Sequence, residues 1–296
     1  MAINFRAPTQ AEIISAIGDV KGLPPSLQHA LRPDTDFEPL SPPKPGDWLA
    51  EHREPGQTFE AYAASKPDRP DKRRKVIYLQ PLGTFIKDRS PDLDLLRAFA
   101  EAYFTLAVRS LPTIDVDELD VTSRINPYTG QRQILSQDVL PLLRRKMPID
   151  AFCGLAVTMH DLYPDPSWNF VFGQVSLEER VGVFSFARYD PVFYGQSRSE
   201  NFSRLLLWRS LKVLAHEIGH MFSLAHCIYY KCVMNGSNHL VESDARPLAV
   251  CPVCLRKLQH AIVFDVLTRY RKLLQFFKQT ALANEVVWLS KRLERL

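Results

Sequence analysis

Residues 216–226 read HEIGHMFSLAH and place three histidines and a glutamate within eleven positions. His216 and His220 stand four positions apart, so on a helix their imidazoles lie on one face, about 6 Å apart, and can bind one metal ion. Zinc holds ligand nitrogens at ~2.0–2.1 Å, which confines all its ligands to a small sphere. Glu217 lies one residue round from that face, where it can hold a zinc-bound water and take its proton as the water attacks a carbonyl. The stretch therefore predicts a catalytic zinc centre with Glu217 as general base.

His226 is the expected third ligand, and it sets a condition on the backbone. On an unbroken helix it would lie ~15 Å along the axis from His216, too far to share the ion. The helix must therefore end after His220 and turn sharply, and Ser223 is the position where we expect the turn. A non-glycine residue in a left-handed conformation costs roughly 1–2 kcal/mol, which a packed domain tolerates. The alternative is a chance pair of satisfied histidines, and the third histidine at this offset argues against it.

Four of the five cysteines predict a second, structural zinc site. They form two short-spaced pairs, Cys227 with Cys232 and Cys251 with Cys254. Paired thiolates on two turns suit a closed tetrahedral site that has no open position for water. Because Cys227 directly follows His226, this zinc would also fix the loop that carries the third catalytic ligand.

Two alternatives stand beside the four-cysteine prediction. The four thiols could be free, or one pair could be redox-active. His239 could replace one of the cysteines as a ligand, although four thiolates are already sufficient. Cys153 falls in a predicted strand and is expected to be a small buried hydrophobic residue.

Composition narrows the class of protein. Apolar residues make up 46% and charged residues 24% of the 296 residues, which is typical of a globular chain. The net charge of +4 is too small to indicate nucleic-acid binding. Residues 1–20 lack the apolar run of a signal peptide, and no stretch reaches the ~18 apolar residues of a membrane span. We therefore expect a cytoplasmic or nuclear protein with reduced thiols; its oligomeric state is not predicted.

The chain divides into two parts by composition. Residues 1–71 are rich in proline and charge, and we expect an extension packed on the core, with short helices near 9–18 and 58–65. Residues 72–296 are expected to form the catalytic domain. Its first half alternates strands and helices, which indicates a parallel sheet with packed helices. The expected elements are a strand at 76–79, a helix at 91–108, a short strand at 112–117, a helix at 136–145 with Ser136 as N-cap, and a strand at 152–159.

The second half begins with an aromatic hairpin. Two apolar stretches, 168–175 and 181–187, are separated by five residues, which suits a hairpin and adds an antiparallel strand to the sheet. A helix beginning near Ser203 then carries the histidines. Helical stripes at 255–273 and 282–296 predict core-facing C-terminal helices.

The chain resembles the archaemetzincins. The resemblance rests on the histidine stretch followed directly by Cys227, then Cys232, Met234 and the pair Cys251 and Cys254. It also covers residues 152–189 and 235–240, and in weaker form extends from about 48 to 270. The position of Ser223 is a glycine in metzincins, and this is the main departure.

The resemblance implies an α/β metzincin-like zincin domain. Its parts are a twisted mixed sheet with an antiparallel edge strand, an active-site helix, a Met-turn at Met234 and C-terminal helices. It also implies two zinc ions per chain, one catalytic and one held by the four cysteines. The edge strand around Phe170, Phe172 and Gln174 would align an extended peptide by backbone hydrogen bonds.

We expect a zinc-dependent metallopeptidase that acts on a peptide or protein substrate, with no nucleic-acid or membrane partner. The presence of Glu217 beside His216 favours a peptidase, because a protein that only binds peptides does not need a carboxylate at this position. The alternative is a catalytically weak or inactive, zinc-stabilised protein that binds peptides or proteins. A fourth protein ligand on the first zinc would exclude hydrolysis and favour that alternative.

Overall fold

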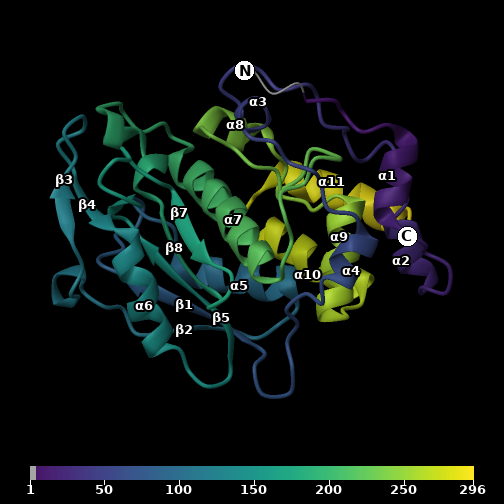
Figure 1. Cartoon of the computed structure of the whole chain (residues 1–296), viewed down its shortest axis with the longest axis horizontal. Helices are drawn as coiled ribbons and strands as arrows, with labels where there is room; N and C mark the ends of the chain where they lie inside the picture. The colour runs from purple at the N-terminus through teal and green to yellow at the C-terminus, as the bar shows by residue number, and fades with distance from the viewer. Residues whose placement is uncertain (1–4) are drawn as a thin grey trace. The chain divides into compact units, whose positions relative to one another are not determined.

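The computed structural model describes residues 5–296 (Figure 1). The first four residues of the predicted N-terminal extension lie outside this range. The chain divides into two compact units, one of Pro70–Met221 and the other of the described residues up to Arg69 together with Phe222–Leu296. Residues 222–296 thus share a unit with the N-terminal segment. The predicted roles of 1–71 as an extension and of 72–296 as a catalytic domain stay predictions.

The unit Pro70–Met221 is built on a five-stranded mixed sheet within the described residues. All pairings are parallel except that of β7 with β8 at one end of the sheet. This confirms the predicted α/β class and its antiparallel edge strand. In spatial order the strands are β2 (Val108–Ser110), β1 (Val76–Leu82), β5 (Ala151–Thr158), β8 (Val181–Ser185) and β7 (Gly173–Ser176).

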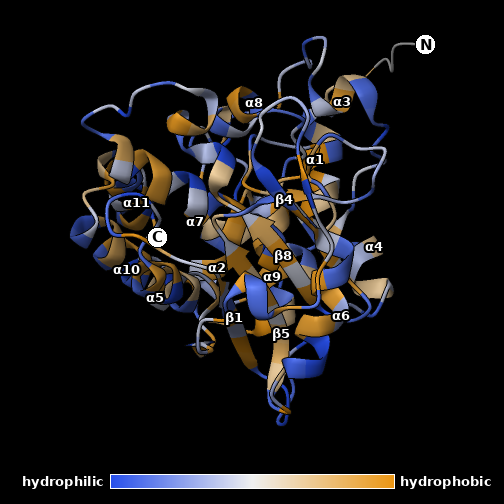
Figure 2. Ribbon diagram, turned by 90° about the vertical axis from the view of Figure 1, so that its left-hand side faces the viewer, coloured by the Kyte–Doolittle hydropathy of each residue, from blue (hydrophilic) through white to orange (hydrophobic). Residues whose placement is uncertain are grey.

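Three helices cover the two faces of this sheet (Figure 2). They are α5 (Leu93–Phe104), α6 (Ser136–Lys146) and α7 (Phe202–Met221). On one face α6 packs on β5, β7 and β8, and on the other α7 packs on β5 and on α5. Successive residues of β8 point to opposite faces of the sheet. Val183 belongs to the core cluster beneath α6, whereas a Cβ on Gly182 would lie 3.2 Å from Met221 of α7. Burial on both faces explains the nearly continuous apolar runs of β5 and β8.

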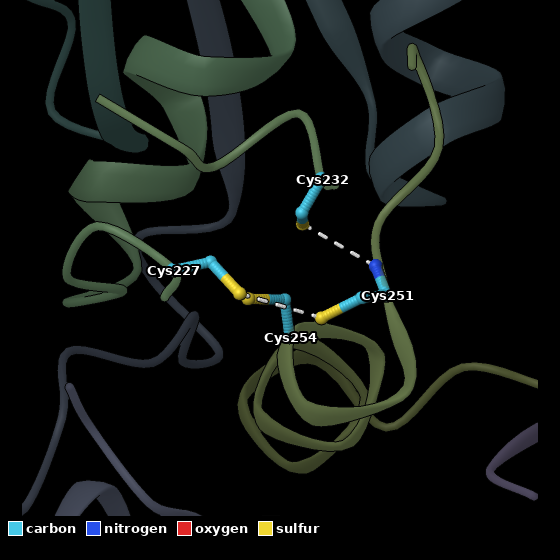
Figure 3. Close-up of side chains that lie close together, drawn as sticks. All are labelled: Cys227, Cys232, Cys251 and Cys254. Carbon is cyan, nitrogen blue, oxygen red and sulfur yellow. Dashed lines mark hydrogen bonds between the residues drawn. The ribbon is translucent and has the colours of Figure 1, made fainter. Parts of the chain in front are cut away.

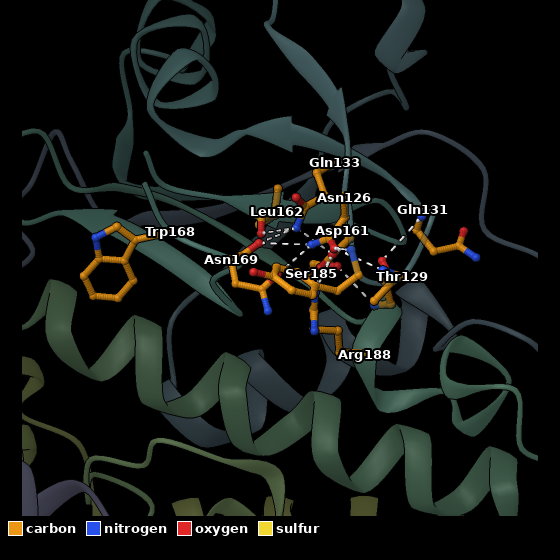
Figure 4. Close-up of polar contacts among 12 residues, drawn as sticks. Asn126, Thr129, Gln131, Gln133, Asp161, Leu162, Trp168, Asn169, Ser185 and Arg188 are labelled. Atoms are coloured by element: carbon orange, nitrogen blue, oxygen red, sulfur yellow. Dashed lines mark hydrogen bonds and ion pairs between the residues drawn. The ribbon is translucent and has the colours of Figure 1, made fainter. Parts of the chain in front are cut away.

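A second, three-stranded sheet extends this unit and encloses a buried ion pair (Figure 4). Its strands are β3 (Ser123–Ile125), β4 (Arg132–Leu135) and β6 (Asp161–Tyr163). Arg188 donates two hydrogen bonds of 2.7 Å to Asp161, and Gln133 donates a third of 2.8 Å. All three side chains are buried, so the guanidinium fixes the loop after β8 against this sheet.

Three predictions about local structure are wrong. The strand expected at 112–117 lies instead at Val108–Ser110, and Asp115 caps a 3-10 turn at Val116–Glu118. The N-cap of α6 is Leu135, because Ser136 is the first helical residue and directs its hydroxyl to Tyr163 O and Gln174 Oε1. The strand expected at 168–175 is confined to Gly173–Ser176, and Val171 only forms a single bridge with Leu162.

The other unit is helical. Its N-terminal helices are α1 (Gln10–Ile17), α2 (Pro25–Ala30), α3 (Trp48–Glu51) and α4 (Phe59–Ala64), and its C-terminal helices are α8 (Leu240–Ala245), α9 (Pro252–Ile262), α10 (Val266–Gln279) and α11 (Ala283–Glu294). The stripe at 255–273 belongs to two helices, because Val263 is left-handed with a φ of 62° and Asp265 caps α10. Helices α1 and α4 pack on α9, and α2 packs on α10. None of the helices within residues 5–296 has both the length and the hydropathy needed to span a membrane.

Candidate metal centres

Helix α7 brings the first two predicted ligands together. The Nε2 atoms of His216 and His220 lie 3.0 Å apart, and the two rings meet edge to face with centroids 4.5 Å apart. Two nitrogens bound to one tetrahedral zinc at ~2.0–2.1 Å lie ~3.3 Å apart, so this pair fits one ion after a small adjustment. Glu217 follows on the same helix and is half-buried. Helix α7 thus presents two imidazoles and a neighbouring carboxylate.

The predicted turn after α7 is confirmed. The helix ends at Met221, and Ser223 has a φ of 62°. Three residues of the N-terminal segment hold this turn: Tyr62 Oη donates to Phe222 O at 2.7 Å, Gln57 Nε2 donates to Ser223 O at 3.1 Å, and Asp68 N donates to Ser223 Oγ at 3.2 Å. The left-handed conformation of Ser223 is therefore stabilised by hydrogen bonds to the preceding carbonyl, to its own carbonyl and to its hydroxyl.

His226 lies in the loop after this turn and contacts the N-terminal segment. Its Nδ1 is 2.8 Å from Glu54 Oε1, and its ring meets the Trp48 indole edge to face at 4.9 Å between centroids. The contact with Glu54 is therefore made by Nδ1 rather than by Nε2. Neither Trp48 nor Glu54 was predicted from the sequence, because Glu54 and His226 are 172 positions apart and nothing in the sequence signals the contact.

The four cysteines come together in one buried cluster (Figure 3). Their sulfurs all lie within 4.8 Å of one another, and Cys227 Sγ is 3.5 Å from Cys251 Sγ. A tetrahedral zinc with Zn–S distances of ~2.3 Å places its sulfurs ~3.8 Å apart, so the cluster fits a four-cysteine site. The loops also aim N–H groups at the sulfur of Cys232, from Cys251 at 3.3 Å and from Met234 at 3.5 Å.

The pKa values of Cys227, Cys232 and Cys251 are shifted because these thiols are buried side by side. Burial, and a hydrogen bond with Cys227, hold the pKa of Cys232 and of Cys251 well above the ordinary value. Burial also raises the pKa of Cys227, but hydrogen bonds from the other three thiols outweigh it and bring that pKa well below the ordinary value. A cation among the sulfurs would offset the repulsion between neighbouring thiolates.

Asn235 orders the loop that carries Cys227 and Cys232. Its side chain donates to Cys227 O at 2.8 Å and to Tyr230 O at 2.9 Å, and it accepts from Cys232 N at 2.7 Å. Met234, the predicted Met-turn residue, is buried, and its carbonyl accepts from Cys227 N at 2.8 Å. This role of Asn235 was not predicted from the sequence, although its three hydrogen bonds hold the conformation of the loop.

Neither His239 nor Cys153 is a member of the four-cysteine cluster. His239 is exposed, with Nε2 3.2 Å from Asp47 Oδ1 and Nδ1 accepting from Glu242 N at 3.2 Å. It therefore caps α8 rather than joining the cysteines. Cys153 is buried in β5, as predicted.

The aromatic residues predicted near the edge strand pack within their own unit. The Arg188 guanidinium stacks 3.6 Å above the Phe170 ring, and Phe172 stacks on Tyr189 at 5.7 Å between centroids. The Gln174 side chain accepts a 2.5 Å hydrogen bond from Ser136. The side chains of these residues are therefore engaged, and Trp168 points away from the polar network beside them (Figure 4).

Comparison with known proteins places the chain among peptidases. Residues 138–260 match the model of peptidase family M54. Archaemetzincin-2 of Mus musculus is 40% identical over 278 residues, which cover 84% of this chain and 77% of that protein. Human archaemetzincin-2 is 40% identical over 279 residues with the same coverage. Archaemetzincin-1 of Mus musculus is 35% identical over 281 residues, covering 83% of this chain and 55% of that protein.

Two solved structures are similar to part of the chain. The crystal structure of archaemetzincin from Methanopyrus kandleri covers 66% of this chain and 99% of its own, with 28% identity and a TM-score of 0.48. A zinc-dependent peptidase from Methanocorpusculum labreanum covers 62% of this chain and 99% of its own, with 25% identity and a TM-score of 0.47.

Proposed function

The chain belongs to the archaemetzincin family of zinc metallopeptidases, and from this premise we propose that it hydrolyses peptide bonds with Glu217 as the general base. The observation that carries the proposal is the pair His216 and His220 on α7, with Nε2 atoms 3.0 Å apart and Glu217 one residue round the helix. The substrate is a peptide or a protein.

His226 completes the proposed catalytic site as third ligand. Five residues separate it from His220, and the left-handed Ser223 within them reverses the chain, as a third ligand from this loop requires. Three imidazoles are a ligand set that zinc takes in hydrolytic sites and that leaves one position open. The four clustered cysteines have one another as partners, so none of them is needed as a further ligand at the histidines.

The proposed mechanism assigns the proton transfers to this chain. Bound zinc supplies Lewis-acid polarisation of water and of the scissile carbonyl. Glu217 accepts the proton of the attacking water and passes it to the departing amine, which balances the hydrolysis. Its half-buried position suits both steps, because it limits solvent around the carboxylate while keeping it accessible to a substrate.

A second zinc at Cys227, Cys232, Cys251 and Cys254 is proposed to be structural, giving two ions per chain. The buried position of all four sulfurs and the two N–H groups aimed at Cys232 support a closed site. Thiolates in this role need a reducing environment, so we propose the cytoplasm or the nucleus as the location.

The substrate is proposed to lie along β7, with Met234 as the Met-turn residue. Strand β7 is antiparallel and stands at one end of its sheet, so its backbone can pair with an extended peptide. Since Phe170 and Phe172 stack on Arg188 and Tyr189, the backbone near Gln174 would make the contact rather than the two rings.

Metal analysis of single variants tests the ligand assignment. Replacing any one of the three histidines with alanine is expected to remove one zinc per chain and to leave the other in place. His239→Ala is the matched control, because this exposed histidine caps α8 and is expected to leave both ions bound. Retention of two zincs in His216→Ala, or loss of one in His239→Ala, would contradict the assignment.

A further inference from the structure

The N-terminal segment 48–57 packs on the loop that carries His226. Glu54 Oε1 lies 2.8 Å from His226 Nδ1, and the two side chains are only 19% and 20% exposed. The same oxygen accepts a 2.9 Å hydrogen bond from Trp48 Nε1. One carboxylate oxygen is thus directed at both the indole and the imidazole.

We propose that Glu54 is a positioning residue for the third metal ligand. A neutral imidazole carries one N–H, and an ionised carboxylate only accepts, so a short contact with Nδ1 selects the tautomer that has its proton on Nδ1. Nε2 is then the unprotonated nitrogen, whose lone pair is the one that binds a metal ion. The inference rests on the proposed role of His226, and it adds the N-terminal segment to the parts of the chain that determine metal affinity.

The position of Glu54 is itself determined by Trp48. The Trp48 backbone N–H donates to Glu242 Oε1 at 2.9 Å, and its indole stacks on His52 at 3.8 Å between centroids. Gly236 lies directly against the indole, where a Cβ would be 2.5 Å from the ring. The indole is therefore held on two sides, and its Nε1–H restrains the carboxylate that meets His226.

The backbone of the His226 loop is held by the same segment. The Gln57 side chain donates to Ser223 O and accepts from Ala225 N, each at 3.1 Å. Lys257 of α9 donates to Gln57 Oε1 at 3.0 Å, and so fixes the amide in this orientation. Gly56, with a φ of 76°, approaches Ile228 so closely that a Cβ would lie 2.8 Å from Cδ1. The segment thus restrains the ligand ring through Glu54 and its backbone through Gln57.

The test measures zinc affinity of the full chain by competition with a chromophoric chelator. Carboxylates that orient metal-bound histidines typically contribute 10–100-fold to affinity. We expect Glu54→Ala to weaken zinc binding at the histidines by ~10–100-fold and to leave the cysteine site unchanged, so that the second ion reports an intact fold. Glu51→Gln is the matched control, because Glu51 is exposed on the same segment and contacts Asn238; its affinity should equal that of the wild type. Wild-type affinity in Glu54→Ala overturns the inference.

A second readout separates this inference from the proposed function. In the His220→Ala chain, with zinc only at the cysteines, ¹⁵N NMR of the His226 ring is expected to show the Nδ1–H tautomer. Adding Glu54→Gln should remove that preference, since an amide can donate as well as accept. If the wild type binds no zinc at its histidines, the proposed function fails, and this spectrum alone decides the role of Glu54. An unchanged His226 tautomer in the Glu54→Gln chain overturns the proposed positioning role of Glu54.

Discussion

The backbone N–H of Asp68 donates a 3.2 Å hydrogen bond to the Oγ of Ser223, the left-handed residue that turns the chain after α7. A glycine would adopt this conformation without strain but would lack the hydroxyl. A left-handed serine costs roughly 1–2 kcal/mol, and a hydrogen bond of this kind contributes about 1 kcal/mol. The two effects nearly cancel, so serine can replace the metzincin glycine here.

Substitutions at Ser223 should show this balance. We expect Ser223→Gly to change the free energy of unfolding by less than about 1 kcal/mol, because it removes the strain and the hydrogen bond together. Ser223→Val should destabilise by more than about 2 kcal/mol, because it loses the hydroxyl and places a β-branched residue at positive φ. Urea denaturation at saturating zinc measures both. Equal stability of the valine variant and the wild type would contradict this account.

The cysteine cluster and Cys153 should respond differently to substitution. Cys254→Ser is expected to remove about one zinc per chain and to lower the midpoint of thermal unfolding, because a structural zinc contributes folding energy. Cys153→Ala is the control: the residue is buried in β5 and burial raises the pKa of its thiol, so its loss should affect packing and not metal content. Metal analysis and calorimetry check both variants. Zinc loss in Cys153→Ala, or two zincs in Cys254→Ser, would exclude the four-cysteine assignment.

The buried pair of Asp161 and Arg188 should contribute far more stability than an exposed pair in the same unit. We expect Arg188→Met to cost about 3–5 kcal/mol, because it leaves the Asp161 carboxylate buried without its charge partner. Arg109→Met, which removes an exposed pair with Asp150 at 3.2 Å, should cost less than about 1 kcal/mol. Denaturant unfolding compares the two. Similar losses in both variants would show that the Asp161 network is not a stabilising element.

His160 should make stability depend on pH. Burial, together with the nearby Arg132, lowers the pKa of His160 below its ordinary value. The unfolded chain then binds this proton at a higher pH than the folded chain, so stability is complete above about pH 6.5 and falls as the pH drops from there toward the lower folded pKa. His160→Gln should reduce the slope of unfolding free energy against pH between 7 and 5. An identical slope, measured at saturating zinc, would exclude His160 as its source.

Much of the sheet and its helices could be predicted because local pattern and tertiary burial agree. The apolar runs of β5 and β8 are long because both faces of the sheet are covered. The apolar stripe at 255–273 wrongly suggested one continuous helix. Val263 ends the first of two helices by adopting a left-handed conformation, and a valine does not signal such a break as a glycine would. Ser136 likewise has the composition of an N-cap but is used for a tertiary contact with Tyr163.

The ligand residues of both metal centres could be named from spacing, since zinc demands particular side chains at short separations. The residues that support them could not. Glu54 and Gln57 contact the His226 loop although they lie more than 160 positions away in the sequence. Nothing in the sequence distinguishes these two polar residues from others that make no such contact. Asn235 lies within the loop, yet its three hydrogen bonds depend on backbone conformation that spacing does not reveal.

The decisive measurement for Glu217 as general base is the cleavage of a peptide library by the wild type and by Glu217→Gln, with zinc content determined on the same samples. We expect two zincs per chain in both proteins, and a loss of cleavage of about 100-fold or more in the variant, because the general base is removed while the ligands remain. Equal cleavage by both proteins would contradict the role of Glu217, and fully metallated wild type without cleavage of any library peptide would contradict the proposed hydrolysis.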